Sequence, residues 1–427
     1  MRDLLFLTHR IPFPPNKGDK VRSFHMLRCL ARHYRVWLGT FIDDPDDWRH
    51  VDEVRRYCAD LYCVPLDPRR AKLLSLRGLL SGEPLTLPYY RDAGLRAWVE
   101  RVIAEQRIER ALLFSSAMAQ YLLGPEHAGL RRVMDFVDVD SAKWTQYAAN
   151  KPWPLSWIYR REGVRLLAFE RAVAADLDAS VFVTVEEAAL FRSLAPEIGA
   201  ERVVAVANGV DTAYFDPARA YPNPYPAGER VLVFTGAMDY WANIDAVESF
   251  AREVFPTIRH ACPESHFYIV GARPAAAVQR LAELPGVRVT GTVPDVRPYL
   301  AHARLAVAPL RIARGVQNKV LEALAMARPV VATPAALEGL VPAAELQGWA
   351  AREPAELARQ VLALLADDAE GERRGRLGHA WVLRHYDWEG NLGQMLPLLE
   401  GERAQQVPGG SCFDSLRLRS GQVAQHK

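Results

Sequence analysis

Lys319 and Glu322 are the residues whose types and spacing point most directly to chemistry, three positions apart in segment 318–327. A lysine ammonium attracts anions such as phosphate groups, and a carboxylate can accept hydrogen bonds from two adjacent hydroxyls, as a ribose presents them. The apolar residues of the segment follow helical spacing, which predicts a helix with one buried stripe and with Lys319 and Glu322 on a neighbouring face. The stripe consists of Val320, Leu321, Leu324 and Ala325. The spacing alone leaves open a nucleotide-binding pair and an ordinary surface ion pair on a core helix.

The elements around this helix would place its first turn at the end of a strand. A buried strand is predicted at 305–308 and another at 329–332, with a glycine-containing loop before the helix. This order of strand, loop, helix and strand is the βαβ unit of a parallel sheet. Asn318 or Gln317 can cap the helix, so that its free N–H groups face the end of the preceding strand. Anions such as nucleotide phosphates bind well at such a place.

Short apolar runs alternate with longer helical patterns along the chain, which is typical of α/β architecture. The predicted strands fall into two sets, separated by the proline- and glycine-rich connector 221–228. The first set is 4–7, 36–41, 61–64, 111–114, 133–136, 181–185 and 203–207, and the second is 231–235, 267–270, 287–290, 305–308 and 329–332. We expect each set to form a doubly wound sheet, with a ligand cleft at the carboxyl ends of the strands.

Composition restricts the class of protein. A chain of 427 residues favours two domains, and its hydrophobic fraction of 50% allows a full core in each. The net charge of +2 argues against a dedicated nucleic-acid binder. Five scattered cysteines without a CxxC pair fit a reducing cytoplasm and disfavour a zinc site or a disulfide framework. The apolar run at the N-terminus is too short for a signal peptide, and no run approaches the length of a membrane span.

Three segments carry a resemblance to a known family: 314–323 (Arg-Gly-Val-Gln-Asn-Lys-Val-Leu-Glu-Ala), 234–241 (Phe-Thr-Gly-Ala-Met-Asp-Tyr-Trp) and 135–144 (Asp-Phe-Val-Asp-Val-Asp-Ser-Ala-Lys-Trp). The first resembles the nucleotide-sugar signature of the family 4 retaining glycosyltransferases. These enzymes have the GT-B fold, in which two Rossmann-like doubly wound parallel-sheet domains face each other across a cleft. The second glutamate of that signature falls on Glu322, whereas the first falls on Arg314. Together the segments are similar to the sugar transferases of PEP-CTERM/exosortase exopolysaccharide systems, over residues 3 to 395.

The resemblance implies a division into domains. Residues 1–208 would form the acceptor-side domain, which a C-terminal crossover helix at 385–400 would rejoin. Residues 209–384 would form the nucleotide-sugar-binding domain. Segment 401–427 has no apolar periodicity, and we expect it to be a disordered tail.

The resemblance also implies two groups of site residues. The candidate donor-binding residues are Gly236, Val293, Arg314, Gly315, Asn318, Lys319 and Glu322. The candidate catalytic residues are Gly18, Asp19, Lys20 and Arg22, to which the motif at 138–140 adds Asp138. Asp19 is expected to cap the first helix. The family's arginine and lysine for the diphosphate are absent from 237–243, so Arg314 and Lys319 are expected to supply that charge.

Asp138-Val139-Asp140 has the form of a metal-binding Asp-x-Asp motif. A divalent metal would neutralise a diphosphate leaving group, so metal ligation is chemically sensible. The motif lies in the first domain, away from the donor helix. We therefore prefer a role in orienting acceptor or sugar hydroxyls, or in capping a loop, and expect no metal or other cofactor.

These features predict a glycosyltransferase that moves a hexose from a nucleoside-diphosphate sugar to a saccharide or a polyprenyl-linked acceptor. Two rivals stay open: a nucleotide-sugar epimerase or hydrolase, and a non-catalytic scaffold of a polysaccharide assembly. Segments 69–80 and 153–161 mix cations with leucine or tryptophan, which suits an anionic bilayer, although core-packed helices with a basic face are an equal alternative. We expect a cytoplasmic protein in contact with the inner membrane and no nucleic-acid partner.

Overall fold

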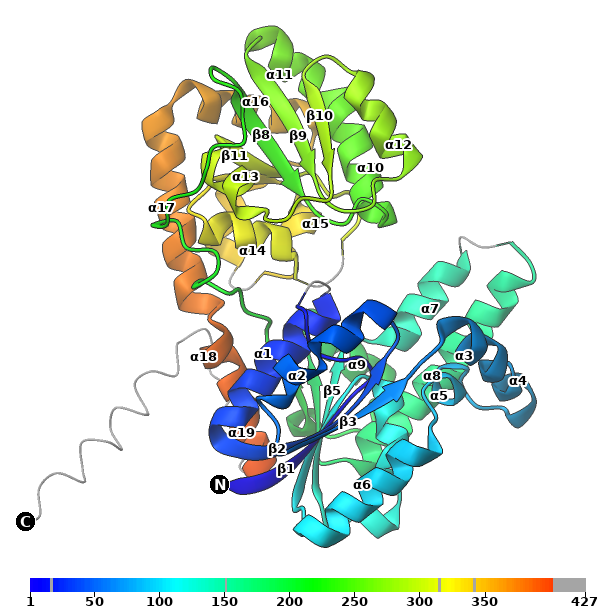
Figure 1. Cartoon of the computed structure of the whole chain (residues 1–427). Helices are drawn as coiled ribbons and strands as arrows, with labels where there is room; N and C mark the ends of the chain where they lie inside the picture. Colours follow the sequence, from blue (N-terminus) through cyan, green and yellow to red (C-terminus); the bar gives the residue numbers. More distant parts are fainter. Residues whose placement is uncertain (16–17, 150–151, 314–315, 341–342, 402–427) are drawn as a thin grey trace, which may run out of the picture. The chain divides into compact units, whose positions relative to one another are not determined.

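The computed structural model describes residues 1–15, 18–149, 152–313, 316–340 and 343–401. Chain contacts divide it into two compact units, shown as ribbons in Figure 1. Unit 1 comprises Met1–Asn208 and the segment that begins at Asn391, and unit 2 comprises Gly209–Gly390. Of the tail predicted at 401–427, everything from residue 402 onward lies outside the described residues.

Unit 1 is built on a parallel sheet whose seven described strands follow the order β3-β2-β1-β4-β5-β6-β7. These strands are β1 (Arg2–Thr8), β2 (Tyr34–Ile42), β3 (Asp60–Pro65), β4 (Arg110–Phe114), β5 (Arg131–Val137), β6 (Ala179–Phe182) and β7 (Val203–Ala205). The helices are α1 (Gly18–His33), α2 (Val51–Arg55), α3 (Pro68–Ser75), α4 (Arg77–Ser81), α5 (Thr86–Tyr89), α6 (Ala93–Gln106), α7 (Asp140–Ala149), α8 (Leu155–Asp176), α9 (Val185–Leu194) and α19 (Met395–Glu400).

Unit 2 repeats this plan with a smaller parallel sheet, whose five described strands follow the order β10-β9-β8-β11-β12. The strands are β8 (Arg230–Thr235), β9 (Ser265–Val270), β10 (Val287–Gly291), β11 (Leu305–Ala308) and β12 (Val330–Ala332). The helices are α10 (Trp241–Ser249), α11 (Phe255–Ala261), α12 (Ala276–Arg280), α13 (Arg297–His302), α14 (Asn318–Ala325), α15 (Pro334–Leu337), α16 (Pro354–Ala366) and α17 (Asp368–His385). The short helix α18 (Trp388–Gly393) spans the change of unit.

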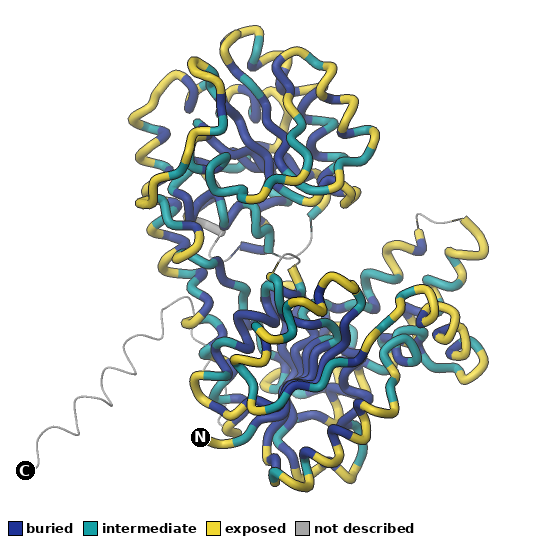
Figure 2. Tube along the Cα trace, viewed as in Figure 1, coloured by how far each residue is buried: buried dark blue, intermediate teal, exposed yellow. Residues whose placement is uncertain are grey.

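Burial explains why these runs form central strands. All residues of β4 are buried, and Leu4–Leu7 of β1 have no exposed surface. Figure 2 shows the strands of both sheets as the buried interior of each unit, with helices on both faces. Strands covered on both faces read as continuous apolar runs, which is the pattern of a parallel α/β sheet.

Each predicted strand has a counterpart in the structure, and two local differences occur, one at the end of a strand and one in the C-terminal helix. The run 181–185 is not strand to its end, because β6 stops at Phe182 and Val185 begins α9. Thr184 caps that helix by accepting a hydrogen bond from the Glu187 N–H at 3.1 Å. The single helix predicted up to Glu400 is divided into α18 and α19. Pro397 cannot donate to the preceding turn, and glycines near the break favour helix poorly.

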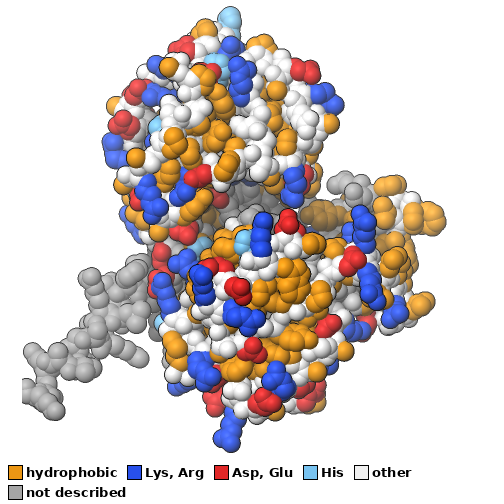
Figure 3. Space-filling model, viewed as in Figure 1, with side chains coloured by type: hydrophobic (Ala, Val, Ile, Leu, Met, Phe, Trp, Pro, Cys, Tyr) orange, Lys and Arg blue, Asp and Glu red, His pale blue; other side chains and the backbone are white. Residues whose placement is uncertain are grey.

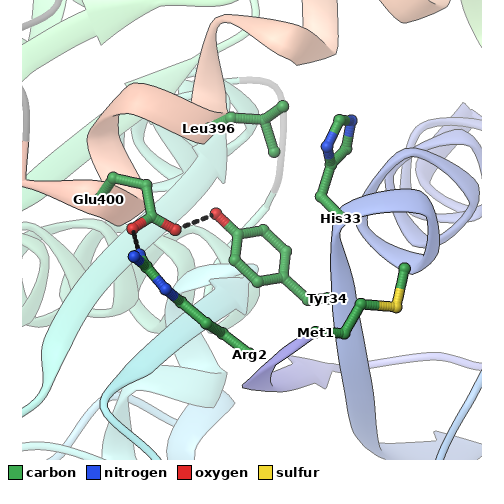
Figure 4. Close-up of a pocket in the computed structure, with 6 residues that line it drawn as sticks. All are labelled: Met1, Arg2, His33, Tyr34, Leu396 and Glu400. Atoms are coloured by element: carbon green, nitrogen blue, oxygen red, sulfur yellow. Dashed lines mark hydrogen bonds and ion pairs between the residues drawn. The ribbon is translucent and has the colours of Figure 1, made fainter.

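The C-terminal segment returns to unit 1, where α19 packs against β4 and β5. Glu400 accepts a hydrogen bond from the Tyr34 hydroxyl at 2.7 Å and pairs with Arg2. Burial, followed by this hydrogen bond, raises the pKa of Tyr34. Figure 4 shows the pocket beside this anchor, lined by Met1, Arg2, His33, Tyr34, Leu396 and Glu400. Because β1 and β2 begin here, the pocket lies at the amino ends of the strands, away from the usual ligand edge.

We call the side of each sheet at which its parallel strands finish the carboxyl edge. Loops leaving β1, β2 and β5 meet at the carboxyl edge of unit 1, and those leaving β8, β10 and β11 at that of unit 2. Among the described helices, none combines the length and the apolar content that crossing a membrane requires.

Candidate functional site

The first turn of α14 brings Lys319 to the carboxyl edge of unit 2. The helix buries Val320, Leu321, Leu324 and Ala325, as the spacing predicts, and this fixes the direction of the opposite face. The Lys319 ammonium donates to the Asn243 side-chain oxygen at 3.0 Å and lies 5.2 Å from the centre of the Phe234 ring. The cation is therefore held by an amide and an aromatic face. Gln317 occupies the N-cap position, with no capping hydrogen bond from its side chain.

Gly236 keeps this place open at the end of β8. A Cβ atom there would lie 2.8 Å from the Asn243 amide nitrogen and 3.5 Å from the Lys319 Cε. The Asn243 amide in turn donates to the Ala237 carbonyl at 2.9 Å, which directs its oxygen to Lys319. Gly236, Asn243 and Lys319 thus form one compact group, and any larger side chain at position 236 would displace it.

Glu322 and Lys319 influence each other's ionisation. Burial raises the pKa of Glu322 to about 7, against the opposing charge of Lys319. Burial also lowers the pKa of Lys319 to about 8, with Glu322 acting in the opposite direction. Both shifts disfavour the charged form, because neither group recovers the full solvation that it loses. An anion near Lys319 or hydroxyl donors near Glu322 would restore those charged forms.

A second cluster, formed by Tyr214, Asp295 and Arg297, lies close enough to Glu322 for its charge to affect Tyr214. Asp295 holds the Arg297 guanidinium with contacts of 2.7 to 3.0 Å, and Arg297 lies 3.8 Å over the Tyr214 ring. Burial raises the pKa of Tyr214, with smaller contributions from Asp295 and Glu322. The aromatic ring of Tyr214 is thereby held in one orientation by a rigid cation.

Of the other donor-side candidates, the structure describes Asn318 and Val293 but not Arg314 and Gly315. Asn318 is the first residue of α14, and Val293 lies on the loop after β10, at the same carboxyl edge. Arg314 and Gly315, expected to contribute charge and a flexible turn, lie outside the described residues. The structure therefore brings together Gly236, Lys319 and Glu322 from the predicted set, and adds Asn243.

At the carboxyl edge of unit 1, Asp19 is bound by basic side chains. It pairs with Arg10, and the His9 Nε2 lies 3.3 Å from its carboxylate. Burial would raise the pKa of Asp19, but the His9 hydrogen bond and the Arg10 charge outweigh it and hold this pKa well below its usual range. The predicted cap at Asp19 is wrong, because α1 begins at Gly18 and Asp19 lies inside its first turn.

Lys20 and Arg22 are buried with acidic partners. The Lys20 ammonium lies 2.5 Å from the Asp47 carboxylate. Arg22 donates to Asp135 at 2.8 Å and to the Asn208 side-chain oxygen at 2.9 Å. Its second terminal nitrogen, Nη2, is buried without a hydrogen-bond partner among the described residues. A buried donor without a partner costs free energy, so this nitrogen is the part of Arg22 that its described contacts leave unsatisfied.

Asp138 follows a strained turn. Val137 has a φ of 70°, which a β-branched residue rarely adopts, and the register of β5 against β6 shifts at this point. The Lys143 ammonium then contacts Asp138 at 2.6 Å and Asp140 at 3.2 Å. A lysine cation thus lies between the two carboxylates that could have shared a metal. Over the described part of the chain, no three His, Cys, Asp or Glu side chains gather in a way that could hold a metal ion.

Three residues near these sites escaped the sequence reasoning. His9 and Arg10 directly follow β1, so their place after the first strand was an available signal. The His9 Nδ1 is buried without a partner in the described residues, and its ring stacks on Phe114 at 5.8 Å. Asn243 belongs to no spaced motif, and only folding brings it to Lys319.

Comparisons with known proteins support the description of the fold. Residues 229–367 match the family described as glycosyl transferases group 1. The structure is similar to sucrose-phosphate synthase from Thermosynechococcus elongatus, with a TM-score of 0.65 and 17% identity, over 94% of this chain and 99% of that one. It is also similar to Anabaena HepE in complex with UDP and glucose, with a TM-score of 0.63 and 16% identity, over 94% and 100% of the two chains.

A third similar structure is that of WaaG, a glycosyltransferase involved in lipopolysaccharide biosynthesis. The TM-score is 0.62 at 17% identity, over 93% of this chain and 100% of that one. No curated protein matches the chain. At such identities the likeness establishes the fold alone, and it confirms the predicted GT-B architecture of two parallel-sheet domains.

Proposed function

We propose that this protein is a retaining hexosyltransferase that uses a nucleoside-diphosphate sugar as donor. The observation that carries the proposal is the group at the head of α14, where a desolvated Lys319 lies beside Gly236 and Asn243. This group falls within the segment that matches the group 1 glycosyltransferases. An anionic diphosphate would meet a cation, a helix N-terminus and room for its oxygens.

Glu322 complements this anion site. Its carboxylate stands on the same face of α14 as Lys319, where it can accept hydrogen bonds from the ribose hydroxyls of the donor. Arg314 is proposed to add positive charge to the diphosphate. Gly236, Val293, Gly315 and Asn318 would then contribute backbone approach and polar contacts. HepE was solved with UDP and with UDP-glucose, so uridine donors are the first to test.

On the acceptor side we infer roles for Gly18, Asp19, Lys20, Arg22 and Asp138. Arg22 offers the uncommitted Nη2 nitrogen, and the Asp138 carboxylate is oriented by Lys143. The acceptor would be a saccharide or a polyprenyl-linked saccharide of bacterial exopolysaccharide biosynthesis. The enzyme would act in the cytoplasm, at the cytoplasmic face of the inner membrane. The PEP-CTERM/exosortase association follows from the resemblance of the sequence motifs.

Transfer would depend on stabilising the departing diphosphate. Lys319, the α14 N-terminus and Arg314 would balance the negative charge that grows as the glycosidic bond to the diphosphate breaks. The carboxylate of Glu322 would hold the ribose, so that this charge develops beside Lys319. We propose that this arrangement works without a metal ion or other cofactor.

A thermal-shift panel of nucleoside diphosphates and their sugars tests the donor. A ligand at one hundred times its Kd stabilises the folded state by about 2.7 kcal/mol, so a true donor should raise the unfolding midpoint by several degrees. The matched variant is Lys319→Met, which should bind diphosphates more weakly and give a much smaller shift. If no uridine or guanosine diphosphate shifts the wild-type midpoint, the donor site is refuted and the scaffold interpretation takes its place.

Sugar transfer is then measured with the donor that binds. A radiolabelled sugar should appear in a membrane-extract acceptor and not as free sugar. Release of nucleotide without any acceptor would instead favour the epimerase or hydrolase alternative.

A further inference from the structure

The clearest feature of unit 1 outside its carboxyl edge is a surface of outward-facing leucines and tryptophans on α3, α4 and the start of α8. We call it the helical platform. Leu80 is 94% exposed and Trp153 is 82% exposed. The platform also exposes Leu73, Leu74, Leu76, Leu155 and Trp157. Exposed apolar clusters of this kind mark interaction surfaces.

The two short helices α3 and α4 bury their small residues and expose their large apolar residues, which is the reverse of the usual arrangement. The residues that α3 buries are Ala71 and Ser75, whereas Leu73 and Leu74 face outward. The residue that α4 buries is Gly78, while Leu80 is almost fully exposed. Small residues therefore contact the protein and large apolar residues contact the surroundings. This arrangement costs free energy in water and gains it against an apolar medium.

Two neighbouring side chains of α8, the half-buried Arg161 and the buried Glu162, join the parts of the platform. Arg161 donates to the Gly78 carbonyl at 2.6 Å and to the Glu83 carbonyl at 3.2 Å. Glu162 accepts hydrogen bonds from the Leu85 and Thr86 N–H groups at 2.7 and 3.0 Å. The segments around residues 69–80 and 153–161, far apart in sequence, thus belong to one rigid surface. Arg161 is consequently a structural clamp and not a free surface cation.

Cations outnumber acidic residues on the platform, and the flanking carboxylates are already bound: Asp67 caps α3 and Glu83 pairs with Arg91. Segment 68–81 contains Arg69, Arg70, Lys72 and Arg77 and no acidic residue, and all four cations are exposed. Arg160, one residue before the clamp, is exposed as well. In Figure 3, basic and hydrophobic side chains are interspersed over these helices. Tryptophan and leucine flanked by cations suit the boundary between anionic headgroups and acyl chains.

From these observations we infer that the helical platform docks on an anionic lipid bilayer. The charge selects the occupant, since a surface with exposed apolar tips and an excess of cations complements anionic headgroups above acyl chains. The inference deepens the proposed function, and rests on it in one respect: a lipid-linked acceptor gives the contact its purpose. Docking itself requires neither donor nor turnover, so it is measured on the protein alone.

Flotation with vesicles tests this docking. The full chain is mixed with vesicles of phosphatidylcholine, or of equal parts phosphatidylcholine and phosphatidylglycerol, at low and at high salt. We expect flotation with the anionic vesicles at low salt and much less in the other conditions. Each cation near an anionic surface changes the partition coefficient about fivefold, so Arg69→Ser, Arg70→Ser and Lys72→Ser together should lower it roughly a hundredfold.

The matched control removes the same charge elsewhere. Arg280→Ser, Arg359→Ser and Arg376→Ser remove three exposed cations from unit 2, so the net charge changes equally, and flotation should stay close to wild type. A second pair, Leu80→Ser with Trp153→Ser, should lower partitioning at least about tenfold. Its control is Leu377→Ser with Leu383→Ser on α17, where exposed leucines stand outside the platform.

The outcomes separate the alternatives. Loss of flotation in both platform variants, with both controls and calorimetric donor affinity unchanged, supports docking. If flotation falls equally in the charge-matched control, net charge alone explains the binding to vesicles, and docking through the helical platform is refuted. Concentration-dependent dimers that Leu80→Ser abolishes, without flotation of the wild type, would show that a second copy occupies the surface. Wild-type flotation without any donor affinity would leave docking intact while refuting the proposed function.

Discussion

The carboxyl edges of the two units differ in the partners that they give to their cations. In unit 1 the cations have acidic partners at short range: Lys20 with Asp47, Arg22 with Asp135, and Lys143 with Asp138 and Asp140. In unit 2 Arg297 also has an acidic partner, Asp295, but the hydrogen bond that the described residues give Lys319 goes to a neutral amide. The first edge therefore compensates its charges internally, and the second keeps a desolvated cation available for an anion.

This difference suggests that the ion pairs of unit 1 have a structural role, whereas Lys319 of unit 2 is suited to binding a ligand. A buried ion pair is costly to break and contributes little net stability, but it fixes the geometry of the loops that carry it. A cation whose pKa is lowered by burial has the most to gain from an incoming anion. We conclude that the unit 1 edge is organised mainly by its own ion pairs, and the proposed function gives the unit 2 edge the role of binding an anion.

The largest expected effect concerns the framework. Asp135→Ala should lower the free energy of unfolding by about 3–5 kcal/mol, because it leaves the buried Arg22 cation without a counter-charge. Urea unfolding measures this difference. The apolar double variant Arg22→Met with Asp135→Leu should recover most of the loss, since it removes both charges. If Asp135→Ala is as stable as wild type, the pair does not organise this edge and the comparison between the units fails.

The second effect concerns the site. Glu322→Ala should lower donor affinity roughly ten- to a hundredfold, or about 1.5–3 kcal/mol, because the ribose hydroxyls lose a charged acceptor. The unfolding midpoint should change little, since Glu322 lies off the buried stripe of α14 and alanine favours helix. Isothermal calorimetry with the nucleoside diphosphate gives the affinity.

The control for this variant is Glu248→Ala, a half-buried glutamate on α10 of the same unit. It should leave the affinity unchanged. A Glu322→Ala protein that binds normally, or that unfolds, would make α14 a structural helix and remove the contrast between the two edges.

A smaller effect, of about tenfold per pH unit beyond the optimum, is expected in the pH dependence of binding. In the proposed function the Lys319 cation binds the diphosphate, so affinity should fall as pH rises through about 8. The Glu322 carboxylate is proposed to accept hydrogen bonds from the ribose hydroxyls, so affinity should also fall as pH drops below about 7. The optimum should therefore lie between these values.

Calorimetry with an intact nucleotide sugar measures this profile, because such a ligand has no terminal phosphate to titrate. In Lys319→Met the fall on the alkaline side should disappear while the acidic fall remains. A flat profile across this range would show that the two groups do not face the ligand.

The smallest expected effect is that of metal removal. Excess EDTA should leave the rate of transfer unchanged, because the Asp138 and Asp140 carboxylates already share the Lys143 ammonium. The assay is sugar transfer with and without EDTA, followed by added magnesium or manganese. Complete loss that a metal restores would revive these aspartates as ligands and make the unit 1 edge a second site.

Much of the fold could be predicted from the sequence, because a strand that is buried on both faces must be apolar throughout. Leu4–Leu7 and the residues of β4 carry that requirement in their side-chain types alone. Boundaries were less certain. The sequence places Val185 at the end of a strand, whereas in the structure Thr184 caps α9 and Val185 is its first residue. This cap depends on a hydrogen bond from the Glu187 N–H, which the residue types alone do not reveal.

The candidate site, too, has features that the sequence predicts and features that only the folded structure shows. The sequence by itself determined the α14 stripe and thereby placed Lys319 and Glu322 on one face, because helical periodicity is a local property. Only the tertiary structure decided that Asn243 meets Lys319, that Arg22 pairs with Asp135, and that Arg161 clamps α4 to α8. These contacts join residues far apart in the chain, and their partners are selected by packing and desolvation, which act only once the sheets have formed.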